Sequence, residues 1–394
     1  MSEERRKKDG SVLLSVDDLC MYFDAKGRRV KASEHITFQI RAGETYGLVG
    51  ESGSGKSTIG KCIIGLNRAT SGSITFNGEE LTGIKNRREY NAKMKDIQMI
   101  FQDPMSSLNP KHTVGEIIRE ALVIQKLGKN REEQEEIVAE ILKKVGIPVE
   151  YRNRYPKDFS GGQRQRIGIA RALVVNPKLI IADECIAALD ASVQAQIVNM
   201  LRNIKEETGT SFLFISHDLT MVRYLSDRIG VLHLGYLLEE GEPEELFTNP
   251  VHPYTRSLLA AIPRMNPVIQ PDRVDPYDYG TSGIDYALGT WHLLSDTHRV
   301  RCTDAELSLW TDGDASATKQ ALYDEDEPSD NEKNFVYEKN ANNGEGIDKR
   351  EDTGNDDDID EDPEEEEFRA EDAPESHIAG NKPSVLTRLR KERT

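Results

Sequence analysis

The residue pattern that says most about chemistry is a glycine-rich run of nine residues. Its members are Gly50, Glu51, Ser52, Gly53, Ser54, Gly55, Lys56, Ser57 and Thr58. The run fits the pattern GxxxxGK[ST], in which glycines let backbone N–H groups turn toward phosphate oxygens at the positive end of a helix. Lys56 would reach the β- and γ-phosphates of a nucleotide, and the Ser57 hydroxyl would ligate Mg²⁺. A glycine-rich turn without a ligand is disfavoured, because an apolar run precedes the pattern and a helical one follows it.

Two adjacent carboxylates, Asp183 and Glu184, stand at the end of the apolar run Leu179–Asp183. A carboxylate in this place suits the coordination shell of Mg²⁺, so Asp183 is a candidate metal ligand beside Ser57. Glu184 is placed to polarise an attacking water molecule. A strand that ends in a polar turn would explain one carboxylate alone. Together with the glycine-rich run, which is the phosphate-binding loop (P-loop) pattern, the pair predicts hydrolysis of a bound nucleotide.

The segments that must position these residues alternate between apolar runs and amphipathic stretches from about Ser11 to Tyr254. The predicted strands are Val12–Val16, Thr37–Ile40, Thr45–Val49, Ile74–Phe76, Ile97–Phe101, Leu179–Asp183, Phe212–Ser216 and Arg228–Leu234. The predicted helices are Ser57–Gly65, Val114–Lys126, Glu132–Val145, Gly161–Val175, Val193–Glu207, Leu219–Leu225 and Thr255–Ile262. This alternation indicates an α/β fold with a largely parallel sheet. Residues 114–145 are predicted to form a helical lobe that begins at a capping box of Thr113 and Glu116.

Most of the negative charge of the chain is concentrated in one segment. Residues 324–376 hold 24 acidic and 5 basic side chains, a net charge of −19, and because all 394 residues carry −18, the rest sums to about +1. A basic nucleic-acid-binding body is therefore disfavoured. The acidic segment cannot bury enough apolar surface to offset chain entropy, so residues 324–394 are predicted to be a disordered tail with a basic tip.

The sequence offers no sign of membrane insertion or export. No run approaches 18 consecutive apolar residues, and the first ten residues, MSEERRKKDG, lack the apolar stretch of a signal peptide. Four widely separated cysteines disfavour a disulfide scaffold and a zinc finger. We therefore expect a cytoplasmic protein whose membrane role, if any, passes through a partner.

The segment Phe159–Arg166, FSGGQRQR, resembles the signature sequence of ABC-transporter ATPases. Other motifs of that family are also present, and their order along the chain is the order found in the family. The adenine-stacking aromatic corresponds to Phe23, with its neighbour Tyr22 as an alternative. The Q-loop glutamine, the D-loop and the switch histidine correspond to Gln102, Ala188-Leu189-Asp190 and His217.

The resemblance implies a P-loop fold of ABC type, with a mixed sheet core, an antiparallel β subdomain and an inserted helical lobe at about residues 103–165. It also implies two ATPase subunits paired head-to-tail, with ATP on the P-loop of one capped by the signature of the other. ATP would be held in this chain by Phe23, Gly50, Ser52, Gly53, Ser54, Gly55, Lys56, Ser57 and Thr58. The signature residues Ser160, Gly161, Gly162 and Gln163 would instead serve ATP bound to the partner. Gln102 would lie near Mg²⁺ and the attacking water, and His217 would position the γ-phosphate, so both join Glu184 as implied catalytic residues.

The resemblance is narrower than the whole family. The segments IFQDPMSSLNPKHTVGEII, ALDASVQAQIVNML and NPVHPYTRSLLAAIP are similar to the peptide/nickel importer branch, of which HPYT (252–255) is typical. DECIAALD (183–190) and TSGIDYALG (281–289) resemble the F-type ATPase subunits of oligopeptide permeases of Gram-positive bacteria. This implies an ATPase that energises oligopeptide import, together with a second ATPase subunit, two membrane permease subunits and an extracellular peptide-binding protein. The chain would then lie peripherally on the cytoplasmic face of the cell membrane, attached through the permease subunits.

The sequence departs from the wider family in two places. Cys185 follows Glu184 where proline is usual, and Ala187 stands where serine is common. Neither change removes a phosphate or metal ligand, so we expect activity to survive and Cys185 to be a small buried side chain. Some relatives carry a cysteine cluster after HPYT, but only Cys302 lies beyond it here, so we expect no iron–sulfur centre.

Two other classes of ABC ATPase are disfavoured by the sequence, and the cargo has alternatives. Chromosome-maintenance and DNA-repair relatives insert long coiled coils between the Q-loop and the signature, whereas Gln102 and Ser160 are only 58 positions apart. Translation-associated relatives usually carry two cassettes in one chain, and this chain has one P-loop. Among importers, a dipeptide, nickel or another small solute stays an alternative cargo.

These features divide the chain into four parts. They are a flexible N-terminus (1–10), an ATPase domain (11–254), a C-terminal extension of the peptide-importer type (255–323) and the acidic tail (324–394). The aromatic residues of the extension are expected to form core rather than a cofactor site.

Overall fold

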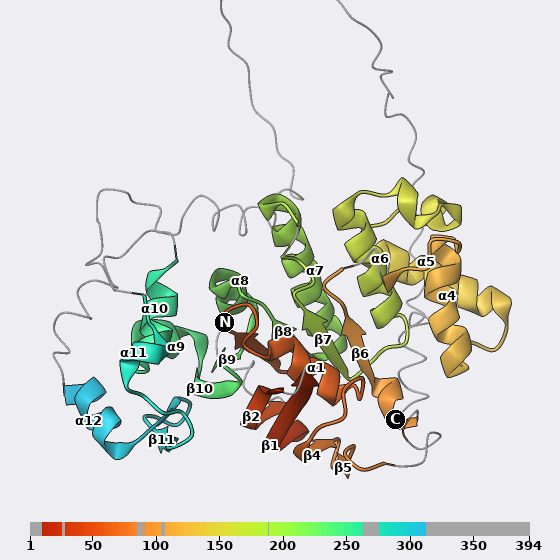
Figure 1. Cartoon of the computed structure of the whole chain (residues 1–394). Coiled ribbons are helices and arrows are strands. Elements are labelled where there is room, and N and C mark those ends of the chain that lie inside the picture. The colour runs from red at the N-terminus through yellow and green to blue at the C-terminus, as the bar shows by residue number, and fades with distance from the viewer. Residues whose placement is uncertain are drawn as a thin grey trace, which may run out of the picture. The chain divides into compact units, whose positions relative to one another are not determined.

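The computed structural model describes residues 10–25, 28–84, 90, 92–103, 107–187, 189–262 and 276–312 (Figure 1). Nearly all of the predicted flexible N-terminus, Ala188 of the D-loop and the whole predicted acidic tail lie outside these residues. Within them, no helix is long and apolar enough to cross a membrane.

The core is an eight-stranded sheet. In sheet order its strands are β11 (Thr290–Leu293), β12 (Arg299–Cys302), β10 (Tyr236–Gly241), β9 (Arg228–His233), β3 (Thr45–Val49), β8 (Ser211–Ile215), β7 (Leu179–Asp183) and β6 (Ile97–Ile100). The five strands from β9 to β6 are parallel, and β10, β12 and β11 pair antiparallel. The predicted parallel sheet is therefore present, and an antiparallel margin widens it.

A second, antiparallel sheet lies beside the core. Its strands, in order, are β2 (Arg28–Arg41), β1 (Val12–Ala25), β4 (Ser71–Phe76) and β5 (Glu79–Glu80). Strands β1 and β2 are far longer than the predicted Val12–Val16 and Thr37–Ile40. Register shifts interrupt the apolar alternation of β1, and Asp18 adopts a positive φ of 51° at one of them. A period-two pattern therefore ends early although the strand continues.

Each predicted helix is present and begins and ends within two residues of its predicted position. These helices are α1 (Lys56–Ile63), α4 (Val114–Gln125), α5 (Arg131–Lys144), α6 (Gly161–Leu173), α7 (Ala191–Thr208), α8 (Leu219–Leu225) and α10 (Pro253–Ala260). Three short helices were not predicted: α9 (Pro243–Thr248), α11 (Tyr279–Ser282) and α12 (Asp304–Asp312). Helices α4, α5 and α6 pack on one another as a lobe (Figure 1). The predicted capping box at Thr113 and Glu116 is confirmed, with both reciprocal hydrogen bonds present.

Alternate residues of the parallel strands enter two different cores. In β7, Leu179 and Ile181 join the core under α1 and the antiparallel sheet. Ile180 and Ala182 of the same strand join the core formed with α4 to α8. Successive side chains of a strand point to opposite faces, so a strand covered on both faces is apolar throughout. This explains why β3, β7 and β8 are buried at every position.

The C-terminal extension continues the core sheet. Strand β12 pairs antiparallel with β10, and β11 pairs with β12. Strand β10 was missed in the sequence because Glu239 and Glu240 resemble surface residues. Both are nearly inaccessible, and their charges are met by His298 and by two arginines, Arg228 and Arg299.

Candidate nucleotide-binding and hydrolytic site

The residues predicted to do chemistry follow four neighbouring parallel strands. The glycine-rich loop follows β3, Gln102 lies just beyond β6, Asp183 and Glu184 end or follow β7, and His217 lies just beyond β8. Neighbouring parallel strands end at the same edge of the sheet, and ligands of open α/β sheets bind outside that edge. The topology therefore brings together residues that lie up to 167 positions apart, from Gly50 to His217.

The phosphate loop, residues 50–56, packs closely against strands β9 and β2. Gly50 has φ 148°, and a Cβ there would lie 2.0 Å from the carbonyl oxygen of Leu232. Gly55 has φ 109°, and a Cβ there would lie 2.1 Å from the carbonyl oxygen of Ala32. Both backbone conformations favour glycine, and neither position leaves room for a side chain. The loop shape thus depends on β2 and β9 as much as on its own sequence.

Lys56 is folded back into the loop. Its side chain is only 3% exposed, and Nζ donates hydrogen bonds to the carbonyl oxygens of Gly50 at 2.7 Å and Glu51 at 2.8 Å. Burial lowers the pKa of the Lys56 ammonium, while the carboxylates of Glu184 and Asp183 act in the opposite direction. An anionic phosphate in the loop would favour the charged form of Lys56.

Ser57 and Asp183 meet directly. The Ser57 hydroxyl donates a 2.6 Å hydrogen bond to Asp183 Oδ1. Asp183 is 4% exposed, and burial raises the pKa of its carboxyl although the bond from Ser57 opposes that shift. Both residues supply oxygen, the atom that Mg²⁺ prefers, and a buried carboxylate is stabilised by a nearby cation. The pair therefore fits the predicted metal site.

Glu184 lies between Gln102 and His217. Gln102 Nε2 donates to Glu184 Oε2 at 2.8 Å, and His217 Nδ1 lies 3.6 Å from Glu184 Oε1. Glu184 also has a positive φ of 44°, an uncommon conformation for a side-chain-bearing residue, and its N–H donates to the carbonyl of Ile215 at 2.9 Å. Strained backbone of this kind is concentrated at functional sites. All three residues predicted to be catalytic thus form one cluster.

The signature segment caps a helix. Ser160 is the N-cap of α6, and its hydroxyl accepts a hydrogen bond from the N–H of Gln163, whose side chain in turn accepts one from the N–H of Ser160. A Cβ on Gly162 would lie 2.5 Å from Val193 Cγ1 in α7, so this glycine permits close packing of the two helices. Ser160 and Gly161 are exposed, which leaves the N-terminus of α6 open to a partner.

Two further predicted residues lie at the margin of the site. Phe23 is 39% exposed and pairs with Val30 across the β1–β2 hairpin. Val30 lies two positions before Ala32, whose carbonyl oxygen is close to Gly55 of the phosphate loop. The hydroxyl of the alternative, Tyr22, donates to Glu34 Oε1 at 2.6 Å. Asp190 of the D-loop is an exposed N-cap of α7 whose side chain makes no capping bond.

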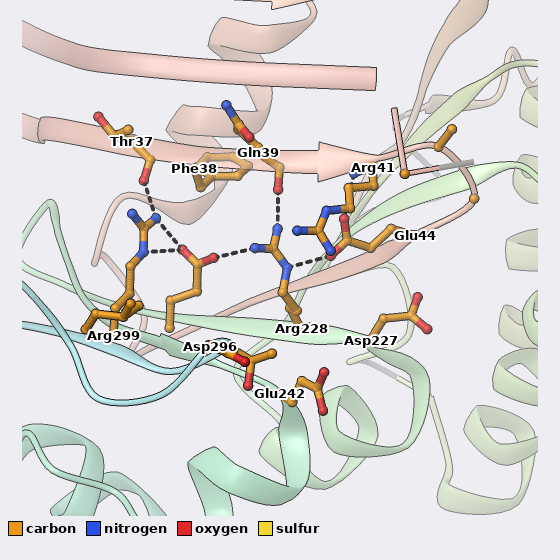
Figure 2. Close-up of a pocket in the computed structure, with 16 residues that line it drawn as sticks. Thr37, Phe38, Gln39, Arg41, Glu44, Asp227, Arg228, Glu242, Asp296 and Arg299 are labelled. Carbon is orange, nitrogen blue, oxygen red and sulfur yellow. Dashed lines mark hydrogen bonds and ion pairs between the residues drawn. The ribbon is translucent and has the colours of Figure 1, made fainter. Parts of the chain in front are cut away.

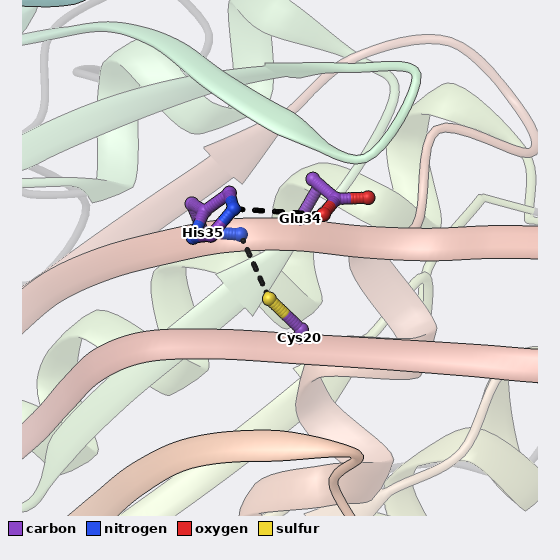
Figure 3. A group of neighbouring side chains, drawn as sticks. All are labelled: Cys20, Glu34 and His35. Atoms are coloured by element: carbon purple, nitrogen blue, oxygen red, sulfur yellow. Dashed lines mark hydrogen bonds and ion pairs between the residues drawn. The ribbon is translucent and has the colours of Figure 1, made fainter. Parts of the chain in front are cut away.

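A trio of possible metal ligands lies in the same hairpin (Figure 3). Ligand atoms of Cys20, Glu34 and His35 lie within 4.8 Å of one another. Glu34 is already engaged, since Tyr22 donates to it and the Lys31 ammonium lies 2.9 Å from Oε2. The Cys20 sulfur accepts the backbone N–H of His35 at 3.3 Å. Because the Lys31 charge would repel a cation, we interpret the trio as a hydrogen-bonded brace of the hairpin.

A cavity of about 560 Å³ lies at the other ends of the strands, where Glu44 precedes β3 (Figure 2). Arg228 contacts Glu44 at 2.7 Å and Glu240 at 2.9 Å. Arg299 of β12 contacts the other oxygen of Glu240 at 2.6 Å. These charges neutralise one another, so we interpret the cavity as the edge of an ion-pair network that fastens the extension to the sheet.

Two contacts with the phosphate loop were missed in the sequence. The N–H of Gly235 donates to the Ser54 carbonyl at 2.9 Å, and the N–H of Glu51 donates to the Tyr254 hydroxyl at 3.1 Å. Nothing in the sequence pointed to Gly235. Tyr254 belongs to the HPYT segment, whose sequence indicates a family branch but does not predict a contact with the phosphate loop.

The two departures from the family pattern leave the cluster intact. Cys185 is 3% exposed, as expected of a small buried side chain, and burial raises the pKa of its thiol to about 12. It is therefore a protonated core residue at neutral pH. The N–H of Ala187 donates to the Glu184 carbonyl at 3.3 Å, a bond that its side chain does not affect.

Comparison with known families gives two matches. The family described as "ABC transporter" matches residues 33–187. The family described as "Oligopeptide/dipeptide transporter, C-terminal region" matches residues 238–277. The first range contains the phosphate loop, Gln102, Glu184 and the signature, and the second contains HPYT.

Three individual proteins that the chain is similar to are named for ATP binding. The oligopeptide transport ATP-binding protein OppF of Bacillus subtilis (strain 168) is 50% identical over 304 residues, which is 76% of this chain and 99% of that protein. The corresponding AmiF of Streptococcus pneumoniae is 49% identical over 303 residues, covering 76% of this chain and 98% of that protein. Among solved structures, the dimeric ATP-binding cassette MJ0796 bound to ADP and Pi is 28% identical with a TM-score of 0.55, covering 59% of this chain and 99% of that one.

Proposed function

The chain belongs to the ABC transporter family, in the branch of the oligopeptide transport ATP-binding proteins, and from this premise we propose how its site drives oligopeptide import. ATP binds to the phosphate loop and is hydrolysed. The free energy of binding and hydrolysis drives oligopeptide transport through a path formed by other subunits. The observation that supports this best is the cluster of Gln102, Glu184 and His217 beside the Ser57–Asp183 pair.

The nucleotide is held by the loop and the hairpin. Lys56 exchanges its bonds to the Gly50 and Glu51 carbonyls for phosphate oxygens. Phe23 stacks on the adenine, because its ring is exposed while the hydroxyl of Tyr22 is committed to Glu34. Ser57, Asp183 and Gln102 would hold Mg²⁺, which neutralises charge on phosphate oxygens when it is bound.

Hydrolysis depends on the carboxylate of Glu184. One of its oxygens accepts a hydrogen bond from the attacking water and polarises it. Gln102 and His217 fix the orientation of this carboxylate from two sides, and His217 also positions the γ-phosphate. Holding the base in place before the reaction lowers the barrier, because little reorganisation is then needed in the transition state.

The active assembly is a head-to-tail pair of ATPase subunits. The exposed N-terminus of α6, with Ser160, Gly161 and Gly162, caps ATP held by a second ATPase subunit. Free N–H groups at a helix N-terminus favour an anion such as the γ-phosphate. The pair works on two permease subunits at the cytoplasmic face of the membrane, and an extracellular peptide-binding protein delivers the cargo. The helical lobe contacts the permease, so that closure around ATP is coupled to opening of the path.

Purification from mildly solubilised native membranes tests this assembly. We expect two polytopic membrane proteins and a second, similar ATPase to accompany the chain. Ribosomal or DNA-associated proteins alone would overturn the transport function and leave the ATPase chemistry standing. The accompanying binding protein is then titrated with oligopeptides, dipeptides and nickel. Dipeptides are the second candidate cargo, since the family matched at residues 238–277 is described for both peptide classes.

A further inference from the structure

A buried polar cluster joins the C-terminal extension to the phosphate loop. Its members, called here the aromatic cluster, are His233, His252, Tyr254, Tyr277, Tyr286 and Trp310. Tyr277, Tyr286 and Trp310 come from the extension, whereas His233 ends β9 of the core sheet. The hydrolytic mechanism above uses none of these residues.

Tyr254 contacts the phosphate loop through the backbone N–H of Glu51. The N–H of Glu51 donates to its hydroxyl at 3.1 Å, while the carbonyl of the same Glu51 accepts the Lys56 ammonium at 2.8 Å. The two bonds use different groups of Glu51, so a turn of Lys56 toward a phosphate would not by itself break the bond to Tyr254. The hydroxyl can therefore hold this amide whether or not Lys56 has turned.

The Tyr254 ring is held rigidly. It is 2% exposed and stacks on His233, with ring centroids 4.0 Å apart and an angle of 15° between planes. His233 Nδ1 bonds the Tyr286 hydroxyl at 2.7 Å. Strand β9, which ends at His233, pairs parallel with β3, which ends at the loop, so the ring and the loop share one scaffold.

The backbone around the HPYT segment is held by a buried carboxylate of strand β10. The carboxylate of Glu239, fully buried in β10, accepts the N–H groups of Val251 at 2.7 Å and His252 at 3.0 Å. It also pairs with Nε2 of His298, a residue of the extension, at 2.8 Å. His252 Nδ1 accepts the N–H of Tyr254 at 3.0 Å. Burial raises the pKa of Tyr254 to about 12, so its hydroxyl stays neutral at physiological pH.

We propose that Tyr254 is a positioning residue for ATP binding, through which the C-terminal extension holds the phosphate loop in its binding shape. This rests on the proposed function, because the loop must bind ATP for its shape to matter. An amide held in place before the ligand arrives need not be ordered at the moment of binding, and preorganisation of this kind raises affinity. The extension thereby acts on ATP affinity without touching the nucleotide.

Tyr254→Phe tests this with little disturbance, because the ring and its stacking on His233 remain. We expect the dissociation constant for ATP, measured by calorimetry on the full chain, to rise about three- to tenfold, the range for one lost hydrogen bond in a buried site. In the assembled transporter, KM for ATP should rise by a similar factor with kcat within about twofold, since the lost interaction serves the ground state and the transition state alike. Hydrogen exchange at the Glu51 amide should accelerate.

Tyr277→Phe is the matched control. It removes a hydroxyl of the same cluster, which bonds Tyr286 at 3.1 Å and Ser282 at 3.3 Å and does not contact the loop. If both variants bind ATP as the wild type does, or both weaken equally, Tyr254 has only a structural role and the inference is overturned. Failure of the wild type to bind ATP, or undiminished binding by Lys56→Ala, would instead refute the proposed function.

Discussion

Gln102 Nε2 donates a 2.8 Å hydrogen bond to Glu184 Oε2 although 82 positions separate the two residues in the chain. Gln102 lies just before the helical lobe, and Glu184 follows strand β7, which pairs with β8 and β6. In the proposed mechanism, a movement of the lobe would therefore shift the Gln102 amide that orients the Glu184 carboxylate. A permease bound to the lobe and the ATP site would then affect each other through this contact.

Glu184→Gln should nearly abolish ATP turnover and trap bound ATP. The amide keeps the size of the side chain and can still contact Gln102, but it no longer polarises water as a base. Loss of a general base typically costs 10²- to 10⁴-fold in rate, so we expect kcat to fall by about this factor while the dissociation constant for ATP stays similar. Single-turnover and steady-state assays on the transporter measure both quantities.

Glu242→Gln supplies the comparison, because Glu242 is exposed and lines the cavity at the opposite ends of the parallel strands. Its rate should equal that of the wild type. A Glu184→Gln subunit that turns over at the parental rate in its native heterodimer would show that the catalytic half-site is the other one, bound by the partner.

Ser160→Ala should impair hydrolysis of ATP held by the partner subunit. Loss of an N-cap hydroxyl costs about 1 kcal/mol of stability, so a general weakening of α6 must be separated from a signature effect. Thr113→Ala makes that separation, because Thr113 caps α4 with the same reciprocal capping box. We expect both variants to lose similar stability in thermal unfolding.

Only Ser160→Ala should slow the heterodimer, and ATP binding by the isolated chain should be unchanged in both variants. Equal ATPase rates for the two variants would exclude a signature role for Ser160.

Asp183 and Glu184 were predictable from the apolar run that precedes them, whereas Gln102 and His217 were predicted only from the resemblance to ABC-transporter ATPases. The structure gives the physical reason why these residues meet: parallel strands end at one edge of the sheet, and Gln102, Glu184 and His217 follow β6, β7 and β8.

The sequence left open whether Phe23 or Tyr22 stacks on the adenine. The hydrogen bond from Tyr22 to Glu34 distinguishes the two residues, because it engages the Tyr22 hydroxyl. That bond depends on the β1–β2 hairpin, whose full length the sequence does not reveal because register shifts interrupt its apolar pattern.

The C-terminal extension was harder to predict, since charged groups of β10 and aromatic groups of the extension are buried together. Glu239 looks solvated in sequence, yet it accepts two backbone N–H groups and pairs with His298 inside the core. Compensation of this kind needs residues about 60 positions further along the chain, which no local pattern reports. The contact between Tyr254 and Glu51 was out of reach for the same reason.

Deletion of residues 324–394 should leave ATP hydrolysis and transport unchanged. These residues lie outside the described structure, and the segment is predicted to be a solvated tail. The Bacillus subtilis relative is covered over 99% of its length by 304 residues of this chain, so the shared machinery does not need all 394. ATPase rate and peptide uptake of the truncated chain are the measurements. A change in either one would show that the acidic tail has a regulatory or docking role.

His252→Asn should make the stability of the protein less sensitive to acid. Burial, with smaller effects from His233 and Arg256, lowers the pKa of His252 to about 3, whereas an unfolded histidine titrates near 6.5. Below pH 6.5 the unfolded chain therefore binds a proton that the folded chain refuses, so folding loses stability as the pH falls toward 3. Between pH 7 and pH 5 this residue alone should cost roughly 2 kcal/mol.

Asparagine suits the test because it is also a good N-cap and does not titrate, so α10 keeps its cap. The variant should be less stable than the wild type at pH 7, because the His252 ring packs against Trp310 with centroids 5.0 Å apart. Denaturant unfolding at pH 7 and pH 5 separates the two effects, since packing loss is common to both and proton linkage is not. The difference between the two proteins should therefore narrow at pH 5. A difference that stays constant would mean that His252 takes up its proton in the folded protein as readily as in the unfolded chain.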